Sequence, residues 1–335
     1  MRDQTSRAWR VTAGLLIAVL TAGVSRSQSA PPQPAAAKQS PQDLIDALHA
    51  AFGEHHARAV HAKGILLEGS FTAARTARTV SREPIFAGGT LPVIVRFSDF
   101  TGIPDIPDTA GDANPRGFAV KIKARSGDVD LVTHSFNGFP VATSDEFAVF
   151  LRAIGASGPG VAHPTPIEAF LDRHPIAKAF VTSQPPPPES YATAAYFGVN
   201  SFKFTNGSGR SAFVRYRLVP RAGTHFLAAD DVRAKGPNYL LDEIKQRVAT
   251  TPIVFDWYAQ LAEQGDKVAD PSIAWPEGRT LVLLGTITIT GLSTTPDLDA
   301  RTIFLPGTTH PGIEPADPML TLRNDAYPIS FRKRQ

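Results

Sequence analysis

The sequence predicts an α+β fold built on a closed antiparallel β-barrel of eight strands, with helices inserted between strands and flanking them at both ends. About eight short runs are rich in β-branched and aromatic residues and are bounded by Gly, Pro, Asp or Asn, a pattern typical of strands. Helical patterns occupy the middle and the two ends of the chain. Eight antiparallel strands close naturally into a barrel, and no internal repeat or domain boundary follows residue 40.

The strand runs carry two local signals of their own. The first run is apolar on both faces around Ile65, Leu66 and Leu67, which indicates burial on both sides. The dipeptide Asn206-Gly207, between two later runs, indicates a hairpin. The predicted strands are His61–Phe71, Pro92–Ser98, Gly117–Lys123, Val129–Thr133, Val199–Phe204, Ser211–Val219, Ile253–Leu261 and Thr280–Thr290.

Helix starts are marked by capping residues. Ser40 can cap a helix that runs through Ala51, with Pro41 at its first position and Asp43 in its first turn. The last predicted helix follows Asp317-Pro318 and runs towards Tyr327, where Pro328 discourages its continuation. The remaining predicted helices are Ser144–Ile154, Thr165–Val181 and Asn238–Ala249.

The first 40 residues differ in composition from the rest. Residues 1–30 combine early arginines, an uncharged apolar run from Val11 to Val24 and small residues up to Ala30, as a signal peptide does. The apolar run is short for a membrane span, although an uncleaved anchor helix is the alternative. Residues 31–40 form a Pro/Ala-rich linker, and residues 41–335 form one domain. We therefore expect a periplasmic or secreted protein.

Composition excludes several function classes. The formal net charge of +3 over 335 residues gives no footprint for nucleic acid or an acidic membrane. The chain has no cysteine, which excludes disulfides, thiolate chemistry, Cys-ligated zinc, iron–sulfur clusters and covalent c-type haem attachment. A bound metal must therefore be held by His, Tyr, carboxylate or Met.

Two small groups of residues are candidates for chemistry. His61 stands beside a small Ala and close to a Gly, which leaves space next to its ring, although a lone histidine here is more often an ordinary core residue. Arg96 and Ser98 point to the same face of one strand. A buried Arg requires an anion and a buried hydroxyl requires a partner, but a core carboxylate would satisfy such an Arg equally well.

The C-terminal helix carries the most informative pair. Arg323 lies four residues before Tyr327, on the same helical face. A guanidinium beside a phenol favours the phenolate, and a phenolate is one of the axial ligands that proteins use for haem iron. Taken alone, the pair also fits an ordinary tyrosine at a helix end.

Ordered motifs then reveal a family resemblance. Val-His-Ala-Lys-Gly around His61 resembles the distal segment of the haem catalases, and the other blocks follow in catalase order at compatible spacing. The chain most resembles the short, exported catalase-related peroxidases. The other blocks are Val-Arg-Phe-Ser (95–98), Asn-Pro-Arg-Gly-Phe-Ala-Val-Lys (114–121), Gly-Asp-Val-Asp-Leu-Val (127–132), Pro-Gly-Ile-Glu-Pro (311–315) and the stretch from Met319 through Tyr327-Pro328 to Arg334.

The resemblance implies a barrel of the haem catalase type, a haem b cofactor and the following roles. His61 is the distal acid/base, and Ser98 orients its imidazole. Tyr327 is the proximal iron ligand, and Arg323 stabilises its phenolate. Three arginines face the haem propionates, although strand parity puts the first of them on the opposite face from His61 unless the backbone there is irregular. These arginines are Arg58, Arg96 and Arg334.

The resemblance also implies a reaction and its partners. We expect reduction of hydrogen peroxide or organic peroxides by small organic electron donors, with weak catalase activity. Where catalases place an asparagine after the Asp-Leu-Val strand, Ser135 aligns here, with His134 before it and Asn137 two residues later. We expect a monomer or homodimer that binds no NADPH. The alternatives are a haem-carrying barrel without turnover, an enzyme that rearranges fatty-acid hydroperoxides, and a β-rich binding protein without iron.

Overall fold

The computed structural model describes residues 37–335. The predicted signal peptide (1–30) and most of the predicted linker lie outside the described residues. Within 37–335, no helix combines the length and the apolar character that crossing a membrane requires.

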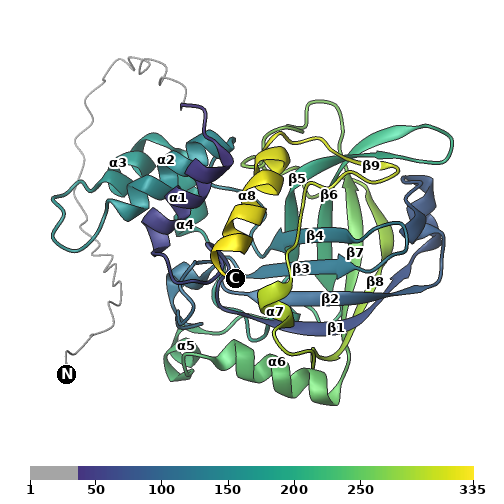
Figure 1. The fold of residues 1–335 in the computed structure, drawn as a ribbon, viewed down its shortest axis with the longest axis horizontal. Helices are drawn as coiled ribbons and strands as arrows, with labels where there is room; N and C mark the ends of the chain where they lie inside the picture. Colours follow the sequence, from purple (N-terminus) through teal and green to yellow (C-terminus); the bar gives the residue numbers. More distant parts are fainter. Residues whose placement is uncertain (1–36) are drawn as a thin grey trace. The chain divides into compact units, whose positions relative to one another are not determined.

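The core of the fold is a closed antiparallel barrel (Figure 1). The sheet order is β4-β3-β2-β1-β8-β7-β6-β5-β9, and a pairing between His134 of β4 and Phe197 of β5 closes the first eight strands. The predicted fold class is therefore confirmed. The strands are β1 Gly64–Ala73, β2 Thr90–Ser98, β3 Gly117–Ile122, β4 Val129–His134, β5 Tyr196–Thr205, β6 Ser211–Pro220, β7 Ile253–Leu261, β8 Leu281–Leu292 and the short β9 Ile313–Pro315.

Alternation along the strands separates the barrel interior from its outer wall. On β2, Val93, Val95 and Phe97 point inward and are fully buried. Aromatic rings fill the interior, where Phe118 packs against Phe255 with ring centroids 4.7 Å apart. A barrel of eight strands is just wide enough for side chains to fill, and these rings occupy its lumen.

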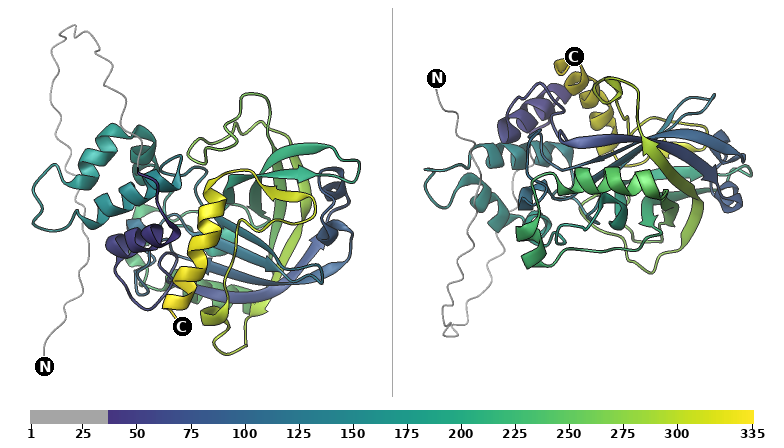
Figure 2. Two further views of the ribbon diagram at one scale, coloured as in Figure 1. Left: turned by 45° about the horizontal axis from the view of Figure 1, so that its top comes forward. Right: turned by 90° about the horizontal axis from the view of Figure 1, so that it is seen from below.

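Helices cover part of the outer wall (Figures 1 and 2). A second apolar cluster forms where α1 packs on α2 and on the C-terminal α8. Ser40 caps α1 as predicted, and together with Asp43 it forms a capping box. The helices are α1 Pro41–Phe52, α2 Ser144–Gly155, α3 Pro166–Arg173, α4 Pro175–Thr182, α5 Ala229–Ala234, α6 Tyr239–Thr250, α7 Leu298–Arg301 and α8 Met319–Lys333.

The structure corrects three predicted boundaries. The single helix predicted from Thr165 to Val181 is two helices, because the residue before a proline disfavours helical backbone and His174 precedes Pro175. The first strand begins at Gly64, not at His61. The last helix does not stop before Pro328 but continues to Lys333.

The packing of helix α8 offsets the energetic cost of its internal proline, Pro328. A proline inside a helix costs roughly 3 kcal/mol because it removes one backbone hydrogen bond and crowds the preceding turn. Here Ala326 is fully buried, and α8 packs on α1. Burial of this face of α8 outweighs the tendency of Pro328 to end the helix.

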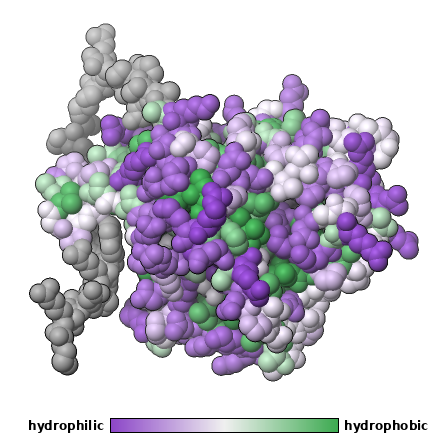
Figure 3. All heavy atoms as spheres, viewed as in Figure 1, coloured by the Kyte–Doolittle hydropathy of each residue, from purple (hydrophilic) through white to green (hydrophobic). Residues whose placement is uncertain are grey.

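The side of the molecule seen in Figure 3 is mostly hydrophilic, with apolar residues visible near its centre.

Candidate functional site

A cavity lies against the outer wall of the barrel. The neighbouring residues Arg96, Ala119 and Val132, paired across β2, β3 and β4, form one row of its floor. Helices α1 and α8, the segment 58–61 and residues 303–304 supply the other walls. Most of the lining is apolar, and its polar members are concentrated at a few points.

The irregular segment before β1 carries His61 into this cavity. His61 has a left-handed backbone with φ 58°, uncommon for a residue other than glycine and often found at functional sites. Its backbone N–H donates to the Phe100 carbonyl at 2.8 Å, which fixes the turn. Because the backbone here is irregular, Arg58 lines the same cavity as His61, and strand parity does not separate them.

Ser98, the last residue of β2, and Asp99, which follows it, define the orientation of the imidazole. Nδ1 of His61 lies 2.9 Å from the Asp99 carbonyl oxygen and 3.1 Å from Ser98 Oγ. A carbonyl oxygen can only accept a hydrogen bond, so Nδ1 carries the proton and donates a hydrogen bond to the backbone carbonyl of Asp99. The lone pair therefore resides on Nε2, which has no hydrogen-bond partner among the described residues. This tautomer makes Nε2 the atom that can accept a proton from a ligand.

Gly117 makes room for the imidazole. It pairs with Ser98 on one side and His134 on the other, so all three residues form the next row of the wall. A Cβ on Gly117 would lie 2.7 Å from His61 Nδ1 and would also collide with Ser98 Oγ. A side chain at this position would therefore displace the imidazole, its orienting hydroxyl, or both.

Burial keeps the His61 ring neutral. It lowers the pKa of His61 to about 3, and the nearby guanidiniums of Arg96, Arg323 and Arg58 act in the same direction, against the hydrogen bond to Asp99. At neutral pH the ring is therefore an uncharged base.

On the α8 wall, Tyr327 accepts two hydrogen bonds from one side chain. Arg323 donates to the phenol oxygen through Nε at 3.1 Å and through Nη2 at 2.6 Å. A guanidinium cannot accept a hydrogen bond, so the phenol oxygen is the acceptor in both contacts.

Further contacts hold this guanidinium from behind. Its Nη1 donates to Asn200 Oδ1 at 2.6 Å, and Asn200 Nδ2 donates to Asp317 at 2.7 Å. A buried chain from β5 to the start of α8 therefore fixes the fork of Arg323 against the phenol.

Three guanidiniums form the charged end of the cavity. Arg58 Nη2 and Arg96 Nε each donate to Asp299 Oδ1 at 2.7 Å. Arg334 donates to the Thr302 carbonyl at 2.7 Å, and Arg58 shares that acceptor at 3.1 Å. Burial and the neighbouring Arg96 charge lower the pKa of Arg58 to about 9 and that of Arg334 to about 10. One carboxylate faces three cations, so this end of the cavity attracts further anions.

The residues after β4 face elsewhere. Ser135 Oγ accepts from the Arg116 backbone N–H at 2.8 Å. With its amide oxygen turned towards Arg217, Asn137 accepts from both terminal guanidinium nitrogens at 3.0 and 3.1 Å. Neither residue lines the cavity, and no asparagine does so among residues 37–335.

His134, the last residue of β4, is a second histidine near His61, and it does not line the cavity. Its Nε2 is buried and has no protein partner, and burial lowers the pKa of His134 to about 3, with smaller contributions from His61 and Arg323. The folded protein therefore leaves this group unprotonated at pH values where the unfolded chain binds a proton. Stability from this group is present above about pH 6.5 and is lost as the pH falls towards 3.

Replacing His134 by glutamine should remove that acid penalty. We expect His134→Gln and the wild type to differ little in their pH trend above pH 7. Between pH 6.5 and 4.5 the variant should gain relative stability at up to about 1.4 kcal/mol per pH unit. Urea unfolding of both proteins at pH 8, 6 and 5 measures this difference. If the free energies of unfolding of the two proteins changed in parallel from pH 8 to pH 5, the pKa of His134 would not be lowered in the folded state.

The cavity suits an anionic, iron-bearing macrocycle. The described part of the chain has no cluster of three or more His, Cys, Asp or Glu side chains that could hold a metal ion. The apolar walls suit a flat aromatic ring system, the arginine end suits carboxylates, and the supported phenol of Tyr327 suits ferric iron. Barrel and cavity together fit the class of haem-binding β-barrels.

Comparison with known proteins specifies the class. The family model "Catalase" matches residues 43–335. The chain is 34% identical over 309 residues to a catalase-related peroxidase of Synechococcus elongatus, covering 90% of each protein. It is 36% identical over 305 residues to a catalase-related peroxidase of Mycolicibacterium paratuberculosis, covering 88% of this chain and 95% of that protein. The chain belongs to the catalase family.

Solved structures support the fold. A fungal catalase superposes with a TM-score of 0.72 at 23% identity, and catalase A from Saccharomyces cerevisiae does so with a TM-score of 0.72 at 21% identity. Each match covers 83% of this chain but only 59% and 61% of the respective solved chain. The present chain therefore spans about three fifths of those catalases and shares their barrel.

Several contributors to the site were absent from the predictions. Asp299, Asn200 and Asp317 support the arginines, and Gly117 provides the space for His61. The glycine had a sequence signal, since it follows Arg116 inside a recognised block. The supporting carboxylates and Asn200 had none, because each contacts residues more than 100 positions away.

Proposed function

We propose that this protein is a haem-dependent peroxidase that reduces hydrogen peroxide or organic peroxides with small organic electron donors, with weak catalase activity. When bound, haem supplies the redox chemistry that cleaves the peroxide O–O bond. The observation that carries the proposal is one cavity whose lining includes a neutral, oriented imidazole and a guanidinium-supported phenol. The catalase-related peroxidases to which the chain is similar support the same assignment.

Each residue has a part that follows from its contacts. Nε2 of His61 takes a proton from the peroxide and returns it to the oxygen that leaves, a type of acid/base assistance typically worth 10²- to 10⁴-fold in rate, as an order of magnitude. Ser98 and the Asp99 carbonyl keep Nδ1 protonated, so the base is always Nε2. Tyr327 is the proposed iron ligand, and Arg323 donates two hydrogen bonds to its oxygen.

The arginine end would hold the carboxylates of haem b. Arg58, Arg96 and Arg334 carry three positive charges against the single charge of Asp299, which leaves an excess of two. Haem b carries two propionates, so the charges balance. The cofactor would therefore enter with its apolar ring against the helices and its carboxylates at this end.

The setting of the enzyme completes the proposal. The signal-like residues 1–30 support export to the periplasm or beyond the cell. The near-neutral net charge supports a small-molecule reductant over nucleic acid as the partner. The proposed assembly is a monomer or homodimer, and sedimentation of the haem-loaded protein measures it.

A donor-dependence assay tests the function. We expect haem-loaded protein to oxidise a phenolic or dye donor in proportion to added hydrogen peroxide, at a rate that greatly exceeds that of free haem. The same preparation is given a fatty-acid hydroperoxide without a donor. Haem binding without donor oxidation would identify a carrier, and donor-independent consumption of the lipid hydroperoxide would identify a rearranging enzyme; either result contradicts the proposal.

A further inference from the structure

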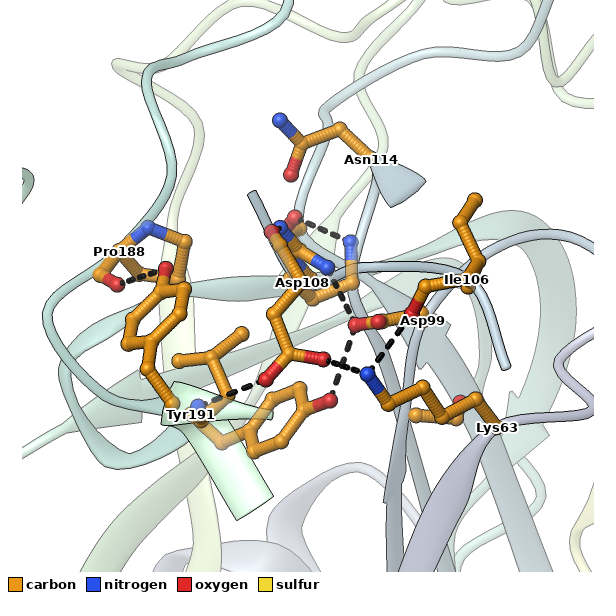
Figure 4. A network of polar contacts seen from close by, with 12 residues as sticks. Lys63, Asp99, Ile106, Asp108, Asn114, Pro188 and Tyr191 are labelled. Atoms are coloured by element: carbon orange, nitrogen blue, oxygen red, sulfur yellow. Dashed lines mark hydrogen bonds and ion pairs between the residues drawn. The ribbon is translucent and has the colours of Figure 1, made fainter. Parts of the chain in front are cut away.

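Four buried charged side chains, Lys63, Asp108, Asp99 and Arg116, form a network that we call the quartet. Figure 4 labels Lys63, Asp99 and Asp108 of this network. Lys63 pairs with Asp108, and Arg116 pairs with Asp99. The side chains of Asp99, Asp108 and Arg116 are fully buried, and that of Lys63 is 4% exposed. Two cations face two anions, so the fully ionised quartet is neutral.

Further hydrogen bonds fix three members of the quartet. Lys63 Nζ donates to the carbonyls of Ile106 and Pro237, both at 2.7 Å. Asp108 accepts from the Leu240 backbone N–H at 2.7 Å, which ties the quartet to the first turn of α6. Tyr191 donates its hydroxyl to Asp99 Oδ1 at 2.9 Å.

Three members of the quartet, Lys63, Asp99 and Arg116, sit on the segments that carry or touch the imidazole. Lys63 is two residues after His61 and Arg116 immediately precedes Gly117. Asp99 follows Ser98 and offers its own carbonyl to Nδ1. Asp99 N–H also donates to the Lys63 carbonyl at 3.0 Å, so two of the segments are joined through the backbone as well.

We propose that the quartet is the positioning element for His61. It positions the neutral imidazole when all four side chains of the quartet are ionised. This inference rests on the proposed peroxidase function, because it assigns residues that keep Nε2 directed at peroxide. The quartet does not touch the cavity, since none of its members lines it. Its members are positioning residues that act through the Asp99 carbonyl and through the places of Ser98 and Gly117.

Ionisation of Asp99 gives the quartet a pH dependence. Burial raises the pKa of Asp99 to about 6, and Asp108 adds to this, while Arg116 and the Tyr191 hydroxyl oppose it. Lys63 faces Asp108, and Tyr239 of α6 faces Arg116. Below about pH 6 Asp99 gains a proton, Arg116 loses its counter-charge and the segment that holds Nδ1 loosens. Titration of His61 itself, with its pKa near 3, falls outside this range.

The reaction of the haem-loaded protein with hydrogen peroxide tests the proposal. We expect the second-order rate constant of the wild type to fall on acidification with a midpoint near pH 6. Tyr191→Phe removes one hydrogen bond from the ionised Asp99, so its pKa should rise by about one unit. The variant should react about tenfold more slowly than wild type at pH 5 and equally fast at pH 8.5.

A neighbouring tyrosine provides the matched control. Tyr239 is also buried and donates its hydroxyl to a backbone carbonyl, that of Pro188, at 2.8 Å, but it donates no hydrogen bond to the quartet. Tyr239→Phe should keep the wild-type midpoint. Three results would each overturn the proposal. The wild-type rate could show no change near pH 6, or the Tyr191→Phe rate could be lowered equally at all pH values. Tyr239→Phe could also show the same midpoint shift as Tyr191→Phe.

Cyanide binding separates this proposal from the proposed function. Binding of hydrogen cyanide to haem also requires a nearby base to take its proton, but it involves no turnover. The rate of the Soret change on cyanide addition should show the same midpoints in the wild type and both variants. A protein that binds cyanide with these midpoints yet never reacts with peroxide would contradict the peroxidase assignment alone, and a flat cyanide profile would contradict the quartet alone.

Discussion

Replacing His61 by alanine should leave haem in place and remove most of the peroxide reactivity. The imidazole contacts Asp99 and Ser98 and is the one histidine ring that lines the cavity among residues 37–335, so its loss removes the base but none of the arginines or Tyr327. The rate constant for peroxide should fall about 10²- to 10⁴-fold. Stopped-flow absorbance at the Soret band, under excess peroxide, measures it.

Two further variants make this result interpretable. His61→Gln keeps a side chain with hydrogen-bonding atoms but no titratable base, so it should be as slow as alanine. His55→Ala removes an exposed histidine from the same segment and should react like the wild type. Wild-type rates in His61→Gln would mean that another group moves the proton.

Replacing Tyr327 by phenylalanine should cost the protein its haem affinity. The change removes only the oxygen that Arg323 holds at 2.6 Å, and the ring can keep its place in the wall. Because partners one step further from a metal already contribute 10- to 100-fold to affinity, loss of the ligand itself should weaken binding by at least about 100-fold. Titration of haem-free protein with haem, followed at the Soret band, measures the dissociation constant.

A substitution of Arg323, which donates to the Tyr327 oxygen, tests the same prediction at a second residue. Arg323→Met should weaken haem binding by about 10- to 100-fold, since it leaves the phenol oxygen without its charged partner. Tyr258→Phe, on the outer face of β7, is the control for loss of a tyrosine hydroxyl and should bind haem as the wild type does. Equal haem affinity in Tyr327→Phe and Tyr258→Phe would exclude Tyr327 as the ligand.

The sequence predicted the barrel well because strand signals are local. Alternation of apolar residues and turn residues at strand ends depend only on neighbours a few positions away, and the run Ile253–Leu261 matches β7 residue for residue. Failures came where tertiary packing outweighed local preference. Pro328 does not end α8, and His61 adopts a left-handed turn that separates it from the strand it was assigned to.

The site was predictable only in part, for a related reason. His61, Ser98 and Arg323 each lie inside a recognisable block of residues. Asp299 balances Arg96 across 203 positions, and Asn200 holds Arg323 across 123. Such pairings follow from how the barrel closes and how α8 returns to it, and no spacing along the chain reports them.

One absorption measurement tests the central claim that this cavity binds haem through Tyr327 and exposes it to peroxide beside His61. Purified protein is loaded with one equivalent of haem, and spectra are taken before and after one equivalent of hydrogen peroxide. We predict a Soret band with the charge-transfer features of a phenolate-ligated ferric haem, followed by a rapid spectral change that a small phenolic donor reverses. A preparation that takes up no haem, or a haem spectrum identical in wild type and Tyr327→Phe, would contradict the account.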